Sequence, residues 1–595
     1  MNIKKLNKIS VVCCAASALF SLSVLSFHAD ISLLAFPLIV VFTAFLAFSS
    51  IKKLFKDNNL SFIAVFRELL QYAPSVMLIS FVLRRAGESG TPFVLDVVSV
   101  LLWLFTSAVS LYILHYLNPK HIKKVSEDWK QFIVDKKYAD KKKRKFGVKW
   151  LCFEILSWVD ALVQAVFMVL LLNIFIVQLY EIPSESMVPE FLIKDRVIVF
   201  KTLCGPNFPL SRVGLPYIKK YKRGDIVVFR NPHYSDDRKS EVRTFVSQLV
   251  YMCSLTTKNI NVDEYGRPKA DPLVKRVCGV PGEQIMLQDG VLYARTKDSD
   301  EFVPVSEDSK WAAWNLNDVK AKFGSKIQEY PVSQEIFDSM IEVENLRSYL
   351  DLDAVEKECA ELSQRFSKAF AAYRSGRPSG AAASFAPGKL VASFNAKKDD
   401  LFERNESFTN EILASSDGDA WFNSFVTGWI PLRPLEADMN LYDKANFRLN
   451  VMLKVAFARL VAMNAELKIS GISEIDWNGD EARNVLLYRL YQLSMYATLL
   501  DQRNMPAFPA NAEDGSAQYI PEDCYFMMGD NRFNSLDMRH AYTSWLQPLC
   551  KEDSDSICYY SNMAPQYVNR NKMLGTTAYR FWPASRRGVP GNTGF

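Results

Sequence analysis

Long apolar runs dominate the first 180 residues of the chain, and much shorter patterns replace them afterwards. A run of roughly 20 apolar residues is enough to cross the hydrocarbon core of a bilayer. Five runs approach or exceed this length, at 9–27, 31–50, 60–83, 93–117 and 151–180. Arg67 and Glu68 interrupt the third, so a partly interfacial position is an alternative for it. The pattern predicts a transmembrane helical region of about five spans over 1–180.

Compact runs of β-branched and aromatic residues, bounded by glycine or charged residues, begin after Phe191. This composition predicts short strands. The predicted strands are 195–200, 224–229, 274–280, 284–287 and 292–294, and later 524–528 and 573–582. Pro281-Gly282 and Asp289-Gly290 read as turns between them. We therefore expect a β-rich, mainly antiparallel domain next to the membrane region.

Helical periodicity returns inside this β-rich region. The predicted helices are 333–373, 398–414, 441–469 and 480–501, and the stretch 375–388, rich in Gly, Ala, Ser and Pro, predicts a linker. The predicted fold class is a membrane protein whose β-rich domain is interrupted by an α-helical insertion. Its parts are 1–180 (membrane), 181–294 (β-rich, first part), 295–518 (insertion), 519–583 (β-rich, second part) and 584–595, a basic tail expected to be disordered.

Positive charge is concentrated between two apolar runs. The whole chain carries a net charge of +6, but residues 120–149 alone hold twelve Lys or Arg and four Asp or Glu. Nucleic-acid binding is one interpretation of such a run. A basic loop between two spans is more typical of a cytoplasmic topology signal, so we assign 119–149 to a cytoplasmic loop and expect no nucleic-acid partner.

Smaller basic clusters predict the orientation of the spans. Lysines precede the first run and follow the second, and both clusters lie on the cytoplasmic side if the amino terminus is inside. Arg84 and Arg85 then fall outside, which argues against this scheme. The last run would deliver residue 181 and its successors to the extracytoplasmic face. The first run could instead be a cleavable signal peptide, but Phe27 makes a poor site for a cut after Ala29, and we favour an anchor.

Cysteine and histidine are sparse for the chain's length. The ten cysteines include no CxxC pair, and the five histidines show no ligand spacing, so we expect no metal and no cofactor. Cys550 and Cys558 bracket a short polar loop that an oxidising compartment could close as a disulfide. The sequence leaves that pairing open.

The stretch Pro183-Ser184-Glu185-Ser186-Met187 follows the last apolar run directly. Serine is a poor nucleophile until a base removes its proton. If 182–188 is extended, Ser184 and Ser186 share a face, so that one hydroxyl attacks and the other donates to the developing oxyanion. A polar strand start is the alternative interpretation of this stretch.

Lys275 is the candidate base, because no histidine stands in a persuasive context. It lies inside the apolar run Leu-Val-Lys-Arg-Val, where burial would lower its pKa from about 10.4. A pKa of about 8 costs roughly 3 kcal/mol at 1.36 kcal/mol per pH unit, which the fold must supply. A strand lysine that reaches out to solvent is the alternative.

Five ordered blocks together resemble the bacterial type I signal peptidases, which are Ser/Lys membrane proteases. The blocks are IPSESMVPEF (182–191), DRVIVF (195–200), RGDIVVFRNP (223–232), KRVCGVPGE (275–283) and GDNRFNSLDMR (529–539). The resemblance implies Ser186 as nucleophile and Lys275 as general base, with the Ser186 N–H and the Ser184 hydroxyl forming the oxyanion hole.

The same resemblance implies supporting roles in the last block. Ser535 would position the lysine amine, Asp537 and Arg539 would form an ion pair, and residues 529–532, with Asp530 and Asn531, would shape the turn behind the site. Shallow pockets for small side chains would be lined by residues that flank the dyad: Tyr180, Ile182, Met187, Phe191 and Val274.

The chain also departs from the family pattern. The resemblance covers about 180–294 and 519–583, and both the number of spans and the long insertion exceed what is usual in the family. Phe533 stands where Asp is common, and Met538 where a small residue is common. Neither position is assigned chemistry, so these departures bear on local geometry.

The resulting prediction is a multi-pass plasma-membrane serine endopeptidase that removes signal peptides outside the cytoplasm. Its partners would be exported preproteins with small residues before the cut, membrane lipid, and in one view the export machinery. Two alternatives remain: a processing protease for a narrow set of exported proteins, and a catalytically silent scaffold whose insertion binds an envelope partner. A self-cleaving transcription regulator fits poorly with five apolar runs.

Overall fold

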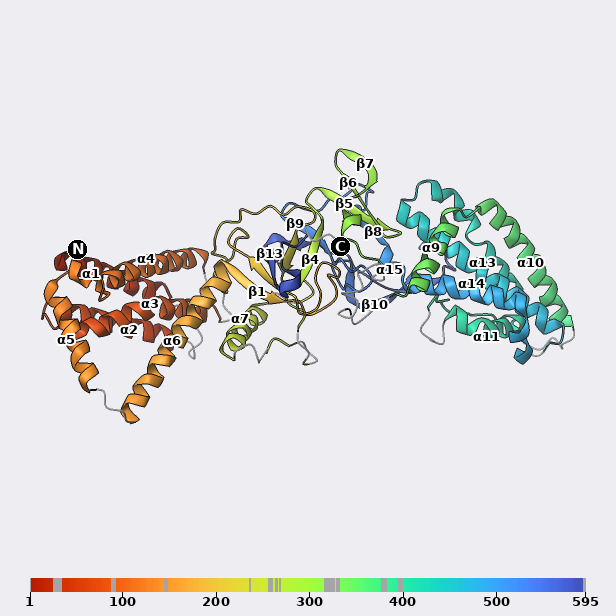
Figure 1. Ribbon diagram of the computed structural model, residues 1–595. Helices are drawn as coiled ribbons and strands as arrows, with labels where there is room; N and C mark the ends of the chain where they lie inside the picture. The colour runs from red at the N-terminus through yellow and green to blue at the C-terminus, as the bar shows by residue number, and fades with distance from the viewer. Residues whose placement is uncertain are drawn as a thin grey trace.

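The computed structural model is elongated, with N-terminal helices at one end, a β-rich body in the middle and a helical body at the other end (Figure 1). The residues that it describes are 2–24, 35–86, 92–143, 148–234, 237–254, 260–262, 266, 269–314, 327, 332–375, 383–393, 400–472 and 474–591.

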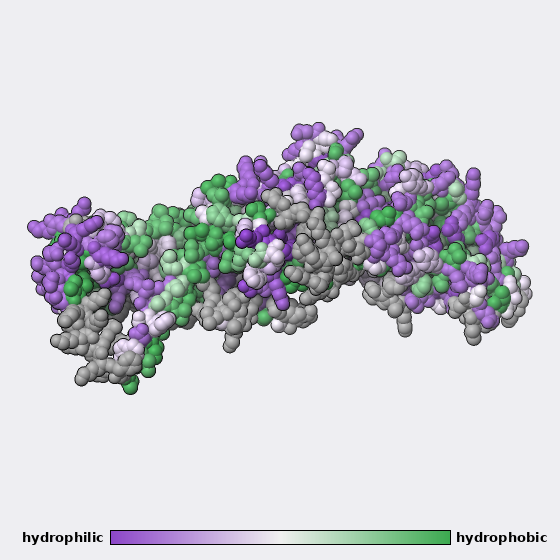
Figure 2. Space-filling view, in the orientation of Figure 1, coloured by the Kyte–Doolittle hydropathy of each residue, from purple (hydrophilic) through white to green (hydrophobic). Residues whose placement is uncertain are grey.

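The N-terminal part is helical, as predicted. Its helices are α1 (Ile3–Val24), α2 (Ala35–Phe55), α3 (Phe62–Arg85), α4 (Phe93–Leu117), α5 (Glu127–Lys143) and α6 (Val148–Phe175). Among the described residues, four helices are long and apolar enough to cross a membrane, and these lie at 3–24, 62–85, 93–117 and 150–175. Figure 2 shows apolar side chains gathered over the end of this part that adjoins the β-rich body, and mostly hydrophilic ones at its far end and over the helical body. The chain is a membrane protein by this pattern, with four candidate spans where about five were expected.

A buried ion pair lies at the end of α3 and the start of α4. Arg85 is fully buried and donates through Nε to Asp96 Oδ2 at 2.9 Å. Ser211, from the β-rich body, donates to the same carboxylate at 2.7 Å, and Phe208 packs against Phe81. The two parts therefore touch through this loop, and the charge of Arg85 is neutralised by Asp96.

The β-rich body is built on a seven-stranded antiparallel sheet. Its strands, in spatial order, are β1 (Val177–Glu181), β2 (Arg196–Phe200), β13 (Met573–Trp582), β3 (Ile226–Phe229), β4 (Leu273–Gly279), β9 (Cys524–Met528) and β12 (Val568–Asn569). Lys275 on β4 faces Val227 on β3, and Val277 faces Met527 on β9. Strand β4 therefore lies between β3 and β9, which are about 300 residues apart in the sequence.

Smaller elements complete this body. A four-stranded sheet has the order β7 (Ser299–Pro304), β6 (Val291–Thr296), β5 (Glu283–Gln288) and β8 (Met505–Phe508). A hairpin pairs β10 (His540–Pro548) with β11 (Cys558–Met563), and α7 (Arg238–Cys253) lies between β3 and β4 in the sequence. The short helical turns η3 (Asp308–Lys310), η7 (Arg570–Lys572) and η8 (Ala584–Arg586) belong to this body, whereas η2 (Ile122–Lys124) lies between α4 and α5 in the N-terminal part. The predicted fold class is confirmed, although α7 and the hairpin were not predicted.

The last apolar run is not helical to its end. Helix α6 stops at Phe175, and the residues from Val177 form β1. Lys201 Nζ donates to Asn173 O and Thr202 Oγ1 donates to Phe175 O, both at 2.8 Å, so the end of β2 supplies donors to the last helical carbonyls. Hydropathy alone does not distinguish an apolar strand that directly follows an apolar helix.

The helical body has α9 (Gln334–Ser348), α10 (Leu352–Ser375), α11 (Leu401–Ala414), α12 (Gly418–Thr427), η5 (Ile430–Ala437), α13 (Leu441–Ile469), η6 (Glu474–Gly479), α14 (Glu481–Thr498) and α15 (Leu500–Arg503). These overlap all four predicted helices. Most of α13 is buried at the centre of one core cluster. Part of the predicted linker, 376–382, lies outside the described residues.

The β structure reaches further into 295–518 than expected. Strands β7 and β8 lie inside that segment and pair with β6 and β5. In the reverse direction, the loop after β10 enters the helical core, where Lys454 pairs with Asp553 at 2.7 Å. The prediction missed this because β7 and β8 are four to six residues long and carry little strand pattern.

The expectation of a disordered tail is wrong for residues 584–591. Arg586 is buried and donates to Asp195 Oδ2 at 2.6 Å, and Gly591 N donates to Glu190 Oε2 at 2.9 Å. Buried carboxylates near β2 therefore hold the tail, and 592–595 lie outside the described residues. Cys550 and Cys558 are both free and buried, so no disulfide joins them.

Candidate active site

Strand β4 carries Lys275 into the interior of the β-rich body. The side chain is 3% exposed, although lysine is among the residues least often buried. Burial lowers its pKa to about 8, while the charges of Asp537 and Asp530 oppose that shift. The outward-reaching alternative for this lysine does not apply, because the amine lies inside the fold.

The amine of Lys275 meets the hydroxyl of Ser186. Lys275 Nζ donates a hydrogen bond to Ser186 Oγ at 2.5 Å. A lysine that is neutral can reverse this bond and accept the serine proton. The two residues are 89 positions apart in the sequence, so it is the tertiary fold that brings them together.

Ser186 lies in a turn, and the expected extended conformation of 182–188 is not formed. Val188 N donates to Glu185 O at 3.0 Å, and Phe191 N donates to Met187 O at 2.8 Å. The two hydroxyls still lie near each other, with Ser184 Oγ donating to Ser186 Oγ at 3.4 Å. Ser184 is exposed and Ser186 half-buried, which leaves the nucleophile candidate open to a substrate.

The segment 529–532 holds the backbone of Ser186 from behind. Asn531 N donates to Ser186 O at 3.2 Å, and Asn531 Nδ2 donates to Glu185 O at 3.2 Å. Gly529 allows the close approach, because a Cβ there would lie 2.4 Å from Ser186 O and 2.1 Å from Ser535 Oγ. A side chain at 529 would push the turn away from Ser186.

Ser535 lies at this contact, but its hydroxyl makes no hydrogen bond. The Oγ atom is buried and has no polar partner among the described residues. Buried hydroxyls normally find one. The orienting bond from Ser535 to the lysine amine is thus not formed in the structure, although the hydroxyl is close to Gly529 and to the carbonyl of Ser186.

Asp537 and Arg539 form a fully buried ion pair. Arg539 Nε lies 2.9 Å from Asp537 Oδ1, and Gly529 N donates to Asp537 Oδ2 at 2.9 Å. Burial disfavours the carboxylate, but Arg539 outweighs it and holds the pKa of Asp537 well below its usual range. Asp537 places a negative charge near Lys275, which Arg539 partly offsets, and its bond to Gly529 N fixes the start of the 529–532 segment.

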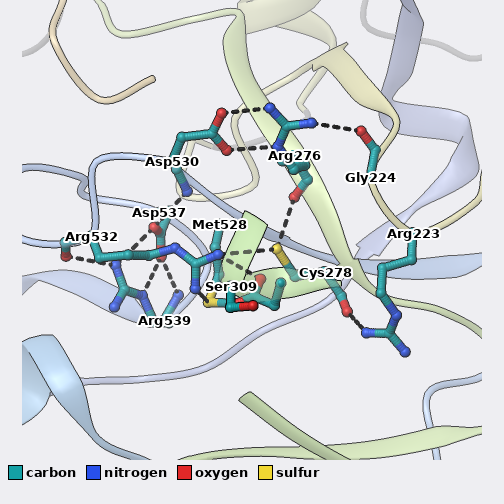
Figure 3. A network of polar contacts seen from close by, with 12 residues as sticks. Arg223, Gly224, Arg276, Cys278, Ser309, Met528, Asp530, Arg532, Asp537 and Arg539 are labelled. Atoms are coloured by element: carbon teal, nitrogen blue, oxygen red, sulfur yellow. Dashed lines mark hydrogen bonds and ion pairs between the residues drawn. The ribbon is translucent and has the colours of Figure 1, made fainter. Parts of the chain in front are cut away.

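Further charged contacts surround this core, as Figure 3 shows. Arg276, next to Lys275 on β4, binds Asp530 through two bonds of 2.6 and 2.7 Å and donates to Gly224 O. Arg532 pairs with Asp308 of η3 at 2.6 Å. Because Lys275 and Arg276 alternate on the strand, Lys275 reaches Ser186 while Arg276, through Asp530, ties β4 to the 529–532 segment.

The five predicted pocket residues share one apolar cluster. Ile182, Met187 and Phe191 are buried in it, and Tyr180 and Val274 pack against it half-buried. The structure therefore brings these residues together on the same part of the fold as Ser186. Whether they receive substrate side chains stays a prediction.

Three contributors were missed from the sequence. Arg276 lies in the block at 275–283 but has no predicted role, and Asp308 and Ala313 lie in the predicted insertion. Ala313 pairs with the turn, since Ala313 N donates to Asp530 O at 2.8 Å and Arg532 N donates to Ala313 O at 3.0 Å. The Lys-Arg pair on one strand was a usable signal for Arg276, because two adjacent buried charges require partners on both faces. Nothing in the sequence marked the other two.

The arrangement contains a candidate nucleophile, a buried amine and hydrogen-bond donors, which are the groups that an acyl-transfer reaction requires. Within the described part of the chain, no group of three His, Cys, Asp or Glu side chains is placed to hold a metal ion.

Comparison with known proteins matches the family described as "Signal peptidase, peptidase S26" to residues 155–336 and 477–582. Signal peptidase I of Buchnera aphidicola subsp. Baizongia pistaciae (strain Bp) is 42% identical over 65 residues, which are 11% of this chain and 21% of the relative. The enzyme of Buchnera aphidicola subsp. Acyrthosiphon pisum (strain APS) is 29% identical over 135 residues, 22% of this chain and 32% of the relative. Signal peptidase I of Bacillus licheniformis is 24% identical over 147 residues, 24% of this chain and 52% of the relative.

These matches span between about a fifth and a half of the length of the relatives. The family match includes the four-stranded sheet, with β7 and β8, and leaves 337–476 of the helical body unmatched. It therefore covers the elements that build the candidate dyad.

Proposed function

We propose, from the match of residues 155–336 and 477–582 to the peptidase S26 family of signal peptidases, that the chain is a membrane-bound serine endopeptidase that removes signal peptides from exported preproteins. The observation that carries the proposal is the 2.5 Å contact between Lys275 Nζ and Ser186 Oγ, made by a buried amine whose pKa lies near 8. An amine with this pKa is neutral often enough at physiological pH to act as a base.

In the proposed reaction, neutral Lys275 takes the proton of Ser186 as its oxygen attacks the scissile carbonyl. The Ser186 N–H and the Ser184 hydroxyl donate to the resulting oxyanion, where one donor is commonly worth 10² to 10³ in rate. The ammonium of Lys275 then gives its proton to the leaving amine, and an acyl-enzyme remains on Ser186. Water activated by the neutral lysine hydrolyses the ester and restores the serine.

The proposed substrate is an extended segment with small side chains before the cut, as signal peptides have. The apolar cluster around Ile182 and Val274 would receive those side chains. We place the amino terminus inside and the β-rich body outside. Burial of Arg84 and pairing of Arg85 with Asp96 support this, because neither charge then lies in a free extracytoplasmic loop.

The test is cleavage of purified preproteins by the intact chain, Ser186→Ala and Lys275→Ala in lipid, with the cut located by mass spectrometry. We expect only the intact chain to cut, after a small residue at the end of the signal sequence. Equal cleavage by Lys275→Ala would refute the dyad. Failure of every form on several preproteins would favour a silent scaffold.

A processing protease for few substrates is the second candidate. The observation that favours it is a direct contact between the helical body and the block that holds Ser186: the ring of Phe337 packs against Phe533, the residue after the 529–532 segment. A panel of unrelated preproteins separates the two candidates, since broad cleavage supports the general enzyme and narrow cleavage the specialist.

A further inference from the structure

Residues 529–533, here called the catalytic turn, lie behind Ser186. The last of them, Phe533, is buried in the core of the helical body. It lies two residues after Asn531 and is 8% exposed. Its ring packs edge-on against Trp314, with centroids 5.4 Å apart, and against Phe337 of α9, at 6.3 Å. Aromatic pairs of this geometry add roughly 0.5–1.5 kcal/mol beyond the area that they bury. The catalytic turn is therefore anchored outside the β-rich body.

A second tie joins the same turn to the helical body. Arg539, the partner of Asp537, donates through Nη1 to Gln502 O in α15 at 2.9 Å. The next residue, Arg503, lies over the rings of Trp314 and Phe337 and pairs with Glu344 of α9 at 2.6 Å. Phe533 thus contacts a side chain of α9, Arg539 contacts a backbone carbonyl of α15, and the Arg503–Glu344 pair connects these two helices.

The other side of the turn holds Ser186. Asn531, two residues before Phe533, contacts this region directly: its N–H and side-chain amide donate to the carbonyls of Ser186 and Glu185. Arg532, between the two, is fixed by Asp308. A displacement of Phe533 would be transmitted through two residues to the Ser186 backbone.

We propose that Phe533 is a positioning residue through which the helical body holds the 529–532 segment against Ser186. The inference rests on the proposed function, because it concerns how the Ser186 and Lys275 pair is aligned. A misplacement of about 1 Å can cost 10²-fold in rate. Displacement of the segment would also loosen the contact between Ser186 Oγ and the buried Lys275 Nζ, so that the amine gains water and its pKa rises toward the ordinary value.

The experiment compares Phe533→Ala, Phe533→Leu, Phe337→Ala and Phe385→Ala in the full chain. Phe385 is the matched control: it is also a half-buried ring against the helical core, in edge contact with Phe408 and Trp421, but it does not touch the turn. Two rates are measured as functions of pH. One is the rate of preprotein cleavage, and the other is the rate at which an activated ester acylates Ser186, which mass spectrometry detects. The ester reports on the nucleophile without any preprotein.

We expect Phe533→Ala to lower kcat and the acylation rate about 10- to 100-fold with KM within about 2-fold. The midpoints of both pH–rate profiles should move to higher pH in Phe533→Ala. Phe533→Leu should restore most of both rates. Phe337→Ala should act in the same direction, and the double variant should lose no more than Phe533→Ala alone. Phe385→Ala should lower thermal stability as Phe337→Ala does, but leave both pH profiles in place.

Two results would overturn the positioning role. The first is an unchanged acylation rate and pH profile in Phe533→Ala. The second is an equal loss in Phe385→Ala and Phe337→Ala at equal thermal stability, which would show general destabilisation. Failure of the proposed function has a different signature: the intact chain acylates at Ser186 but cuts no preprotein, and the variants still rank as above. Absence of both reactions in the intact chain would remove both proposals.

Discussion

The pH dependence of catalysis follows from the burial of Lys275. Lowering its pKa from the ordinary 10.5 to about 8 disfavours the ammonium by about 3 kcal/mol at 1.36 kcal/mol per pH unit. A general base works in its neutral form, so the rate should rise with pH through the folded-state pKa. With a pKa of about 8, the neutral fraction is about one-tenth at pH 7 and about nine-tenths at pH 9.

The rate of single-turnover cleavage should therefore rise about tenfold between pH 7 and pH 9 and then level off. An unperturbed lysine would instead give a rise of about 100-fold over the same interval, still continuing at pH 9. Single-turnover conditions are used because they exclude product release from the measured rate. A continuing 100-fold rise, or a profile unchanged in Lys275→Ala, would refute the assignment.

Lys201 provides the control for this titration. Burial lowers its pKa to about 8 as well, but its amine binds Asn173 O and Gln178 Oε1 at the end of α6. Lys201→Met removes a second titration of similar pKa without touching the candidate dyad. The midpoint of the pH profile should stay near 8 in this variant, whatever happens to the absolute rate.

Three further outcomes are expected. Lys275→Met should raise the free energy of unfolding by up to about 3 kcal/mol at pH 7. This gain should shrink from pH 8 to 10.5, because in that range the lysine is protonated in the unfolded chain but neutral in the folded one. Urea titration at several pH values measures the difference. Ser535→Ala should keep the melting temperature within about 3 °C, since its hydroxyl has no partner to lose, and lower kcat about 10-fold if the hydroxyl orients the amine during the reaction. Asp537→Asn should cost about 3–5 kcal/mol by leaving Arg539 buried without its counter-charge, and Asp537→Asn with Arg539→Met should recover part of that loss in the same titration.

The elements next to the candidate dyad could be predicted from the sequence because they are short, apolar and bounded by strong turn signals. Strands β2, β4 and β9 were expected within two residues of their observed bounds. The contact between Ser186 and Lys275 was reachable only through the resemblance of the blocks, because periodicity carries no information on which strands pair. Burial of Lys275 followed from its apolar neighbours.

Tertiary contacts explain most of what the sequence did not predict. The tail beyond Pro583 looked disordered from its basic composition, yet Arg586 finds Asp195 and is buried with it. Strands β7 and β8 were not expected inside 295–518, because they gain their strand geometry from pairing with β6 and β5. Local composition cannot report a partner that lies hundreds of residues away.

The two departures from the family pattern in the last block have a common physical explanation. Phe533 is buried against Trp314 and Phe337, at the edge of the helical core, and Met538 is fully buried in the core of the β-rich body. A carboxylate at 533 would face aromatic rings, where a charge without a partner is costly to bury. Large apolar side chains at these positions instead fill the two cores on either side of the turn. The helical body thus accounts for Phe533 and the core of the β-rich body for Met538, so the last block is shaped by the two bodies that it joins.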